Sequence, residues 1–260
     1  MRNVGLITID VTNTILKVKN GVGGTYKEIA RRCQAEGMQL TTIGEVSAST
    51  IDAHFMKAFK HSWKAFPNFG YGHMTSKSWW HDVTCQTLET ISEKNITELP
   101  GVLYNHFSTG SAYDVLPGAL HALNTLRGQA PLGIITNNDC RIHSVLRELL
   151  LREYFAFVLT SYECGYAKPH PEIFQHAGSK AGVAVQDILH IGDSFANDYI
   201  AARNCGMRSI LLSEVAVDGC KENHRLKSLL DINPETIEQL LANAWITIIM
   251  LCLNKIFIIY

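Results

Sequence analysis

The stretch NVGLITIDVTNTIL, residues 3–16, decides the fold because its apolar run ends in an acid. Residues 4–9 have the length and the branched side chains of a buried strand, and Asp10 closes the run. An acid in this position is well placed for chemistry, because ligands of α/β proteins bind beyond the carboxyl ends of the strands. Two positions later the chain carries Thr12 and no second acid. The first feature suggests a function, and the second limits it.

Four later runs have the same character as this first strand, and helical patterns separate them. The predicted strands are residues 131–136, 155–160, 187–192 and 208–213. The predicted helices are residues 141–154, 171–183 and 197–207. In the first of these helices, one apolar stripe consists of Ile142, Val145, Leu146, Leu149 and Leu150. The alternation of strands and helices predicts an α/β fold with a doubly wound, Rossmann-like parallel sheet.

A long helical segment interrupts this alternation after the first strand. It is roughly a hundred residues long, far more than one crossover connection needs, so we predict an inserted helical cap. Trp79 and Trp80 are expected to build the cap's own small core. The stretch 66–74 either lines the cleft between cap and sheet or is a plain connecting loop. The predicted division of the chain is a core at 1–16 and 116–243, a cap at 17–115 and an apolar tail at 244–260.

Composition excludes several classes of protein. Hydrophobic residues make up 47% of the 260 residues and charged residues 18%, which predicts a buried core rather than disorder. A net charge of -1 provides no field that would attract nucleic acid or an anionic membrane. The seven cysteines are dispersed and form no CxxC pair, which is typical of reduced thiols in an intracellular, cytoplasmic protein. The tail at 244–260 contains Lys255 and is shorter than the roughly 20 residues that span a bilayer, so a membrane partner is not expected.

Polar residues follow the predicted strands at the points where these strands end. They are Asp10 after the first strand, Thr136 and Asn137 after the second, Lys168 after the third, and Asp193 with Asp198 after the fourth. Because the carboxyl ends of parallel strands meet at one edge of the sheet, we expect these side chains to converge there. Each of them alone could be a helix cap, a turn residue or surface charge. Their common placement instead favours one functional site.

This combination of residue types suits phosphoryl transfer. Asp10 can attack phosphorus and form an aspartyl phosphate that water later hydrolyses. The cluster of Asp10, Asp193 and Asp198 suits Mg²⁺, which prefers oxygen ligands. Lys168 would compensate the charge of the phosphate, and Thr136 would hold a phosphoryl oxygen. The predicted substrate is therefore a small phosphorylated metabolite.

Four short motifs resemble the motifs of the haloacid dehalogenase-like hydrolase superfamily. They are DVTNT, IITNN, KPHPEIF and GDSFAND, in the family's order, and the helical insert after the first resembles the family's C1-type cap. The resemblance implies that Asp10 is the nucleophile and that Thr136, Asn137 and Lys168 bind the substrate. It also implies a Mg²⁺ site formed by Asp10, Asp193, Asp198 and the backbone carbonyl of Thr12.

Thr12 departs from this family pattern. Phosphatases of the family usually read DxDxT, and the second acid protonates the leaving group and then activates water. This chain reads DxTxT. A threonine hydroxyl is too weak an acid for this role, and general acid–base catalysis typically contributes about 10²–10⁴-fold. Turnover is therefore expected to be impaired or restricted to particular substrates.

Three functions remain open at this point. The first is a weak or specialised phosphatase, and the second is a protein that binds a phosphorylated metabolite without turning it over. The third is a 2-haloacid dehalogenase, since that branch also lacks the second acid. Dehalogenases need no metal, however, and the presence of Asp193 and Asp198 argues against this third function.

Two further polar residues lie close to the motifs. His190, inside the fourth strand, is expected to be a hydrogen-bonded core histidine rather than a catalytic one. Asp139, just after the second strand, is expected to have a turn role, with a replacement acid for position 12 as the alternative.

Overall fold

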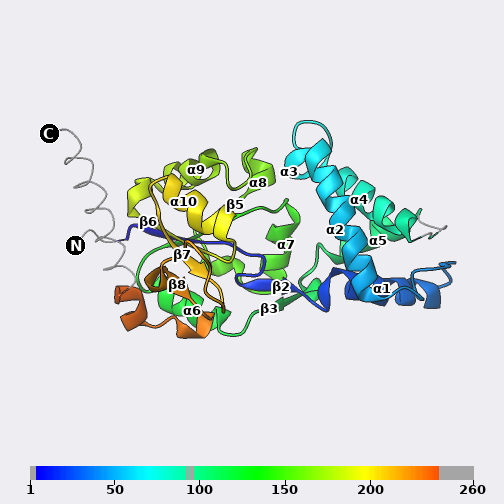
Figure 1. Ribbon diagram of the computed structural model, residues 1–260, viewed down its shortest axis with the longest axis horizontal. Coiled ribbons are helices and arrows are strands. Elements are labelled where there is room, and N and C mark those ends of the chain that lie inside the picture. The colour runs from blue at the N-terminus through cyan, green and yellow to red at the C-terminus, as the bar shows by residue number, and fades with distance from the viewer. Residues whose placement is uncertain (1–3, 92, 94–96, 240–260) are drawn as a thin grey trace.

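The computed structural model describes residues 4–91, 93 and 97–239, so the apolar tail predicted at 244–260 lies outside the described residues. A six-stranded sheet with the order β5-β4-β1-β6-β7-β8 forms the centre of the larger part of the molecule (Figure 1). Every pairing in this sheet is parallel. Its strands are β1 Leu6–Ile9, β4 Leu132–Thr136, β5 Phe157–Thr160, β6 Ile188–Gly192, β7 Arg208–Leu212 and β8 Arg225–Leu226. The short β8 has no counterpart among the predicted strands.

Helices cover both faces of this sheet. One apolar cluster packs side chains of α6 Ala119–Arg127 and α7 Arg141–Glu148 against β1, β4 and β6. A second cluster packs α9 Pro171–Ala181 and α10 Ala201–Asn204 against the opposite face, and the four-residue α8 Ser161–Cys164 follows β5. The shorter helical turns are η1 Gly110–Ala112, η2 Arg152–Tyr154, η3 Val185–Asp187, η4 Phe195–Ile200, η5 Glu222–His224 and η6 Leu229–Asp231. The doubly wound α/β fold is thereby confirmed.

The central strand β1 decides where the site lies. All four of its residues are buried, as expected for a strand that is covered on both faces. It pairs with β4 on one side and with β6 on the other, so the direction of strand addition reverses around it. Ligands of doubly wound sheets bind at this switch point, just beyond the carboxyl ends of the strands. Asp10, the next residue after β1, stands there.

Five helices form the smaller part of the molecule, on the right of Figure 1. We call them the cap helices: α1 Gly21–Ala35, α2 Ala48–Ala65, α3 Pro67–Gly70, α4 Ser76–Thr90 and α5 Leu99–His106. They pack around their own apolar clusters, one of which includes Ile29, Ile51 and Leu88. Trp79, which was predicted to belong to the core of the cap, is fully buried in the other cluster, beside Phe69. The division of the chain at residues 17 and 115 remains a prediction.

A two-stranded ribbon joins the two parts of the molecule. β2 Leu16–Val18 pairs antiparallel with β3 Tyr113–Val115, so both chain crossings between sheet and cap helices run side by side. The helical pattern predicted for 17–115 misses this ribbon. Three-residue strands whose partners are almost a hundred residues apart leave no local periodicity that a sequence pattern could reveal.

Two predicted helices need correction. The helix predicted over 141–154 ends at Glu148, because Leu150 adopts a left-handed φ of 57° and turns the chain. Leu150 is 80% exposed, and Leu151 is buried in its place. The helix predicted over 197–207 begins earlier, with the π-helical η4, and continues as α10.

No helix within residues 4–91, 93 and 97–239 is both long enough and apolar enough to cross a membrane.

Candidate active site

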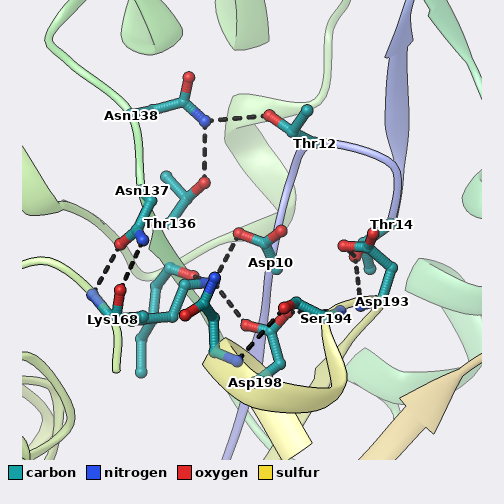
Figure 2. A network of polar contacts seen from close by, with 12 residues as sticks. Asp10, Thr12, Thr14, Thr136, Asn137, Asn138, Lys168, Asp193, Ser194 and Asp198 are labelled. Atoms are coloured by element: carbon teal, nitrogen blue, oxygen red, sulfur yellow. Dashed lines mark hydrogen bonds and ion pairs between the residues drawn. The ribbon is translucent and has the colours of Figure 1, made fainter. Parts of the chain in front are cut away.

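The structure brings the predicted strand-end residues together at one edge of the sheet (Figure 2). Asp10 follows β1, Thr136 is the last residue of β4, and Lys168 lies on the loop between α8 and α9. Asp193 follows β6 directly, and Asp198 belongs to η4. Asp10, Thr136, Lys168 and Asp198 are buried, whereas Asp193 is half-buried. Residues separated by almost 190 positions in the sequence therefore share one site.

Lys168 lies between two carboxylates. Its Nζ donates hydrogen bonds to Oδ1 of Asp10 at 2.8 Å, to Oδ1 of Asp198 at 2.5 Å and to the carbonyl of Ile135 at 3.1 Å. The side chain of Lys168 is only 2% exposed, so these contacts replace almost all of its hydration. A buried ammonium held by charged acceptors has one preferred position. Lys168 is therefore fixed beside the carboxylate that we expect to react.

The pKa values follow from this arrangement. Burial by itself lowers the pKa of Lys168, but the charges of Asp10 and Asp198 outweigh it, so the pKa is raised and the lysine is cationic. Burial raises the pKa of Asp10; Lys168 opposes this only in part, and Asp198 adds to it. One lysine shared by two carboxylates does not neutralise both. The site consequently carries excess negative charge.

Asp198 is held from several sides. Its Oδ1 lies 3.0 Å from Nε2 of His190, and its Oδ2 accepts a hydrogen bond from the backbone N–H of Ser194 at 3.0 Å. Burial raises the pKa of Asp198, but Lys168 and His190 outweigh this effect, and the pKa is lowered. Nδ1 of His190 lies 2.9 Å from the Thr8 hydroxyl. His190 is completely buried and uses both ring nitrogens, which confirms the prediction of a hydrogen-bonded core histidine.

The three acids fit a divalent cation. Asp10, Asp193 and Asp198 each offer one ligand atom, and these atoms lie within 4.8 Å of one another. Burial and the negative charges of Asp10 and Asp198 raise the pKa of Asp193 to about 6. Carboxylates that disfavour one another's charge gain from a cation placed between them, and oxygen ligands are those that Mg²⁺ prefers. The donor set therefore suits Mg²⁺.

Thr14 positions the third acid. Its buried hydroxyl donates to Oδ1 of Asp193 at 3.3 Å and accepts from the backbone N–H of Asp193 at 3.1 Å. Two residues that are 179 positions apart are thus held in register at the edge of the sheet. The residue order of the first motif accounts for this contact, since the second threonine lies four positions after Asp10.

Asn137 has a structural role that the sequence did not predict. Its Nδ2 donates to the carbonyl of Lys168 at 2.8 Å, and its Oδ1 accepts from the backbone N–H of Lys168 at 2.7 Å. Both ends of the amide are therefore used to hold the loop that carries Lys168 (Figure 2). The second N–H of this amide is not used in these contacts, so the predicted contact of Asn137 with substrate stays a prediction.

Asn138 is a site residue that the sequence reasoning missed. Its Nδ2 donates to the hydroxyl of Thr12 at 3.1 Å and to the hydroxyl of Thr136 at 2.9 Å. Thr12 is exposed at the mouth of the site, so Asn138 fixes the residue that replaces the usual acid. The doubled asparagine in IITNN was the available signal. Nothing in the sequence shows which of the two amides points towards the first motif.

Asp139 does not have the geometry of a replacement acid. It is buried, and its carboxylate accepts hydrogen bonds from Nε of Arg141 at 3.0 Å and from Nε1 of Trp80 at 2.5 Å. Its Oδ1 also accepts from the backbone N–H of Arg141 at 2.9 Å, which is the predicted turn role. The Asp139 carboxylate is therefore engaged by Arg141 and by a cap helix, in contacts that a replacement acid would have to give up.

The fold and this arrangement of acids, lysine and hydroxyls define a haloacid dehalogenase-like hydrolase. The family model of that description matches residues 4–206, and the chain belongs to this family. Haloacid dehalogenase-like hydrolase domain-containing protein 3 of Bos taurus is 35% identical over 240 residues, which cover 88% of this chain and 92% of the relative.

Two other similar proteins differ in what their names say they act on. The pyrimidine 5'-nucleotidase YjjG of Escherichia coli (strain K12) is 38% identical over 100 residues, which are 38% of this chain and 44% of that protein. The solved structure of a 2-haloacid dehalogenase from Pseudomonas syringae pv. Tomato DC3000 superimposes with a TM-score of 0.64 at 22% identity. That superposition covers 91% of this chain and 99% of the other, and it shows a shared fold.

Proposed function

We propose that this hydrolase is a Mg²⁺-dependent phosphatase that acts on a small phosphorylated metabolite through an aspartyl phosphate at Asp10. The observation that carries the proposal is the buried Asp10 carboxylate, 2.8 Å from the Lys168 ammonium and grouped with Asp193 and Asp198. Phosphoryl transfer needs a nucleophile beside a cationic side chain and a site for a metal cation, and the residues at this edge of the sheet support both.

The chain's own residues account for the proposed first step. Asp10 uses Oδ1 to accept from Lys168, which leaves Oδ2 to attack phosphorus. A bond forms between Oδ2 and phosphorus, and the bond from phosphorus to the leaving oxygen breaks. Lys168 and the hydroxyl of Thr136 would stabilise the phosphoryl oxygens as charge develops on them. Water then cleaves the aspartyl phosphate, which restores the carboxylate and releases phosphate.

The metal site would be formed by Asp10, Asp193, Asp198 and the backbone carbonyl of Thr12. Bound Mg²⁺ would neutralise the charge of the phosphate group and so reduce its repulsion of the Asp10 nucleophile. The raised pKa of Asp193, caused by burial and by its two acidic neighbours, supports a cation at this position. The Thr14 hydroxyl holds the Asp193 carboxylate in place for that role.

Thr12 determines which substrates would react quickly. Its exposed hydroxyl accepts from Asn138 and cannot protonate an alkoxide near neutral pH. Esters whose leaving groups are already weak bases, such as aryl phosphates, are therefore the substrates for which hydrolysis is fastest. The hydrolysis of the aspartyl phosphate is slowed for the same reason, because no carboxylate at position 12 activates water.

A second candidate function is binding of a phosphorylated metabolite without turnover, and Thr12 is the observation that favours it. A dehalogenase is disfavoured because a half-buried Asp193 joins two other acids in a cluster that suits a cation, which dehalogenation does not require. The nucleotidase relative supports phosphate esters as substrates, although its match is limited to 100 residues. An intracellular, cytoplasmic setting belongs to the same proposal, since the six described cysteines are free thiols.

The test is hydrolysis of para-nitrophenyl phosphate with and without Mg²⁺. We expect Mg²⁺-dependent release of nitrophenol that is abolished by Asp10→Asn and retained by Asp218→Asn, which changes an exposed aspartate. Phosphate binding without release of nitrophenol would select the binding function. Metal-independent release of chloride from 2-chloropropionate would select a dehalogenase and overturn the proposal.

A further inference from the structure

The loop that follows β4 contacts several different elements of the molecule. Asn137 holds the backbone of Lys168, and Asn138 bridges Thr136 and Thr12. Asp139, the next residue, makes contact with the cap helices. The proposed phosphate-binding residues and the cap are therefore connected by four consecutive residues of the chain.

The contact of Asp139 with the cap is direct and partly buried. Nε1 of Trp80, on α4, donates to Oδ2 of Asp139 at 2.5 Å, across 59 positions of sequence. Trp80 also packs within the aromatic cluster of the cap, with its ring centroid 4.9 Å from that of Trp79 and 5.6 Å from that of Phe69. Trp80 is thus anchored in the cap while its only ring donor reaches the core.

Arg141 makes a second contact at the same place. It is the first residue of α7. Its Cζ lies 4.6 Å from the ring centroid of Trp80 and 4.7 Å from that of Tyr104, so the guanidinium contacts an aromatic ring from each of two cap helices. Its Nε is held by both carboxylate oxygens of Asp139. The Arg141 side chain is 13% exposed, which strengthens cation–π attraction.

A purely local explanation of these residues is incomplete. Asp139 accepts from the backbone N–H of Arg141, and this bond alone would begin α7 as an ordinary turn contact. Such a turn requires neither the indole of Trp80 nor the ring of Tyr104. The Asp139–Arg141 pair also packs both of its charges against the cap helices rather than leaving them in water. The arrangement therefore serves the junction of cap and core.

We propose that Asp139 and Arg141 are positioning residues that act through Trp80 and Tyr104 to hold the cap over the loop that follows β4. We call these four residues the clasp. The ribbon of β2 and β3 carries both chain crossings, so it is the hinge about which the cap would turn when the clasp opens. The leaving group of a substrate at Asp10 would emerge at the exposed Thr12, which Asn138 links to the clasp.

The cap makes a second contact with the core, on α8. Nδ2 of Asn68 donates to the carbonyl of Ser161 at 2.8 Å, and the hydroxyl of Tyr162 accepts from the backbone N–H of Ser76 at 3.2 Å. The stretch 66–74 therefore packs on the core and is more than a plain connecting loop. These contacts use neutral groups, whereas the clasp places the Asp139–Arg141 ion pair of the core against the rings of Trp80 and Tyr104. Weakening the clasp is the more selective way to release the cap.

The decisive comparison is between Arg141→Met and Lys77→Met. Both cations lie over the ring of Tyr104, at 4.7 and 5.7 Å from its centroid, but Lys77 belongs to α4 and its contact stays within the cap. Small-angle X-ray scattering of the full chain should give a larger radius of gyration for Arg141→Met than for wild type or Lys77→Met, with the far-ultraviolet circular dichroism unchanged. An unchanged radius of gyration in Arg141→Met overturns the proposal.

A second pair of variants keeps the test decisive if Arg141→Met fails to fold. Trp80→Phe keeps an aromatic ring beside Arg141 but removes the N–H that bonds Asp139, and Asp139→Asn removes the ion pair but keeps an oxygen acceptor for Trp80. Each should increase the radius of gyration by less than the loss of Arg141 does. The same radius in wild type and in both variants contradicts the clasp.

A kinetic measurement extends the test and rests on the proposed phosphatase function. With the clasp weakened, KM for an aryl phosphate should rise several-fold, while KM for acetyl phosphate, whose small leaving group makes less contact with a cap, should stay unchanged. Equal effects on both substrates would place the damage in the loop that follows β4 and contradict the clasp. Absence of all activity would contradict the proposed function alone, because the scattering comparison decides the clasp independently.

Discussion

The site at the edge of the sheet and the interior of the cap are stabilised by different kinds of interaction. At the sheet edge, Asp10, Lys168, Asp198 and His190 are buried and hold one another through charged hydrogen bonds. Inside the cap, rings of aromatic residues pack together, with Trp79 within about 5 Å of several neighbours and almost no exposed surface. Charged hydrogen bonds hold the first region together, whereas aromatic packing holds the second.

This difference predicts where substitutions should affect the reaction and where they should affect the choice of substrate. Among the described residues, the one group of three acidic, histidine or cysteine side chains that could share a metal ion lies on the core. The cap contributes Trp80 and Tyr104 to the junction with the core, and both act there through their rings. A change in the core should therefore alter the reaction, while a change in the cap should alter its own folding or the choice of substrate.

The largest expected effect comes from removing the charge between the core carboxylates. Lys168→Met should lower the rate of Mg²⁺-dependent aryl phosphate hydrolysis by about 10²–10³-fold, because Asp10 and Asp198 then repel the phosphate and each other. Steady-state kinetics measure this loss, and Lys180→Met, on the exposed face of α9, should have no effect. Retention of the full rate would show that the buried ammonium has only a structural role.

The next largest expected effect is an increase in turnover. Thr12→Asp restores the usual acid and should raise turnover of an alkyl phosphate by about 10²-fold, with a smaller gain for aryl phosphates, which need less protonation. Asn138 can donate to the new carboxylate as it now donates to Thr12, so the geometry is retained. Thr12→Asn, which has the same shape without the acid, is the matched control. A gain in both variants would exclude general acid catalysis as the cause.

A substitution of Glu93 tests what stabilises the cap alone. Its carboxylate accepts from the backbone N–H groups of Thr41, Thr42 and Ile43 at 2.7–2.9 Å and from the Thr41 hydroxyl at 2.8 Å. Burial raises the pKa of Glu93, but these hydrogen bonds outweigh it and lower the pKa to about 2. Its stabilising contribution is therefore complete above the ordinary value of 4.5 and is lost as the pH falls through 2.

Glu93→Gln should destabilise the cap at neutral pH by about 3 kcal/mol, since an amide cannot accept all of these bonds. Trp63, Trp79 and Trp80 all lie in the cap, so tryptophan fluorescence during denaturation reports on it; Trp245, outside the described residues, is replaced by Phe in every protein compared. The exposed Glu89→Gln is the control. An identical midpoint in the two variants would show that Glu93 does not hold the cap together.

A substitution of His224 tests the stability of the core at acid pH, and its expected effect is the smallest. It is buried, with Nδ1 2.9 Å from the Tyr199 hydroxyl, and burial together with Arg203 and Lys221 lowers its pKa to about 4. A histidine that is neutral in the folded state contributes stability above the ordinary value of 6.5, and that contribution is lost as the pH falls towards 4. We expect a loss of about 2 kcal/mol across this window.

Denaturation midpoints between pH 7 and pH 4 measure this loss. His224→Gln should flatten the pH dependence, whereas His121→Gln, at an exposed position on α6, should leave it intact. The pH windows of His224 and Glu93 together predict that, as the pH falls, the core loses stability at a higher pH than the cap does. A steep fall that survives in His224→Gln would assign the acid sensitivity to another group.

Much of the core could be predicted because its signals are local. Strands buried on both faces read as short apolar runs, and the run at residues 4–9 ends at the acid that opens the site. The position of His190 inside such a run was enough to predict a core role, which its contacts with Thr8 and Asp198 confirm. Parallel pairing then brings the residues at the strand ends to one edge, whatever the connections contain.

The rest depended on contacts between residues far apart in the sequence. Sequence alone determined the α/β class, the strand-end residues Asp10, Thr136, Lys168, Asp193 and Asp198, and the absence of an acid at Thr12. Only the tertiary structure decided that Asn137 holds Lys168, that Asn138 holds Thr12, and that Asp139 joins the cap. Neighbouring polar residues in a loop look alike in sequence, because the direction of each side chain is set by backbone torsions and by the partners that the packed elements bring within reach.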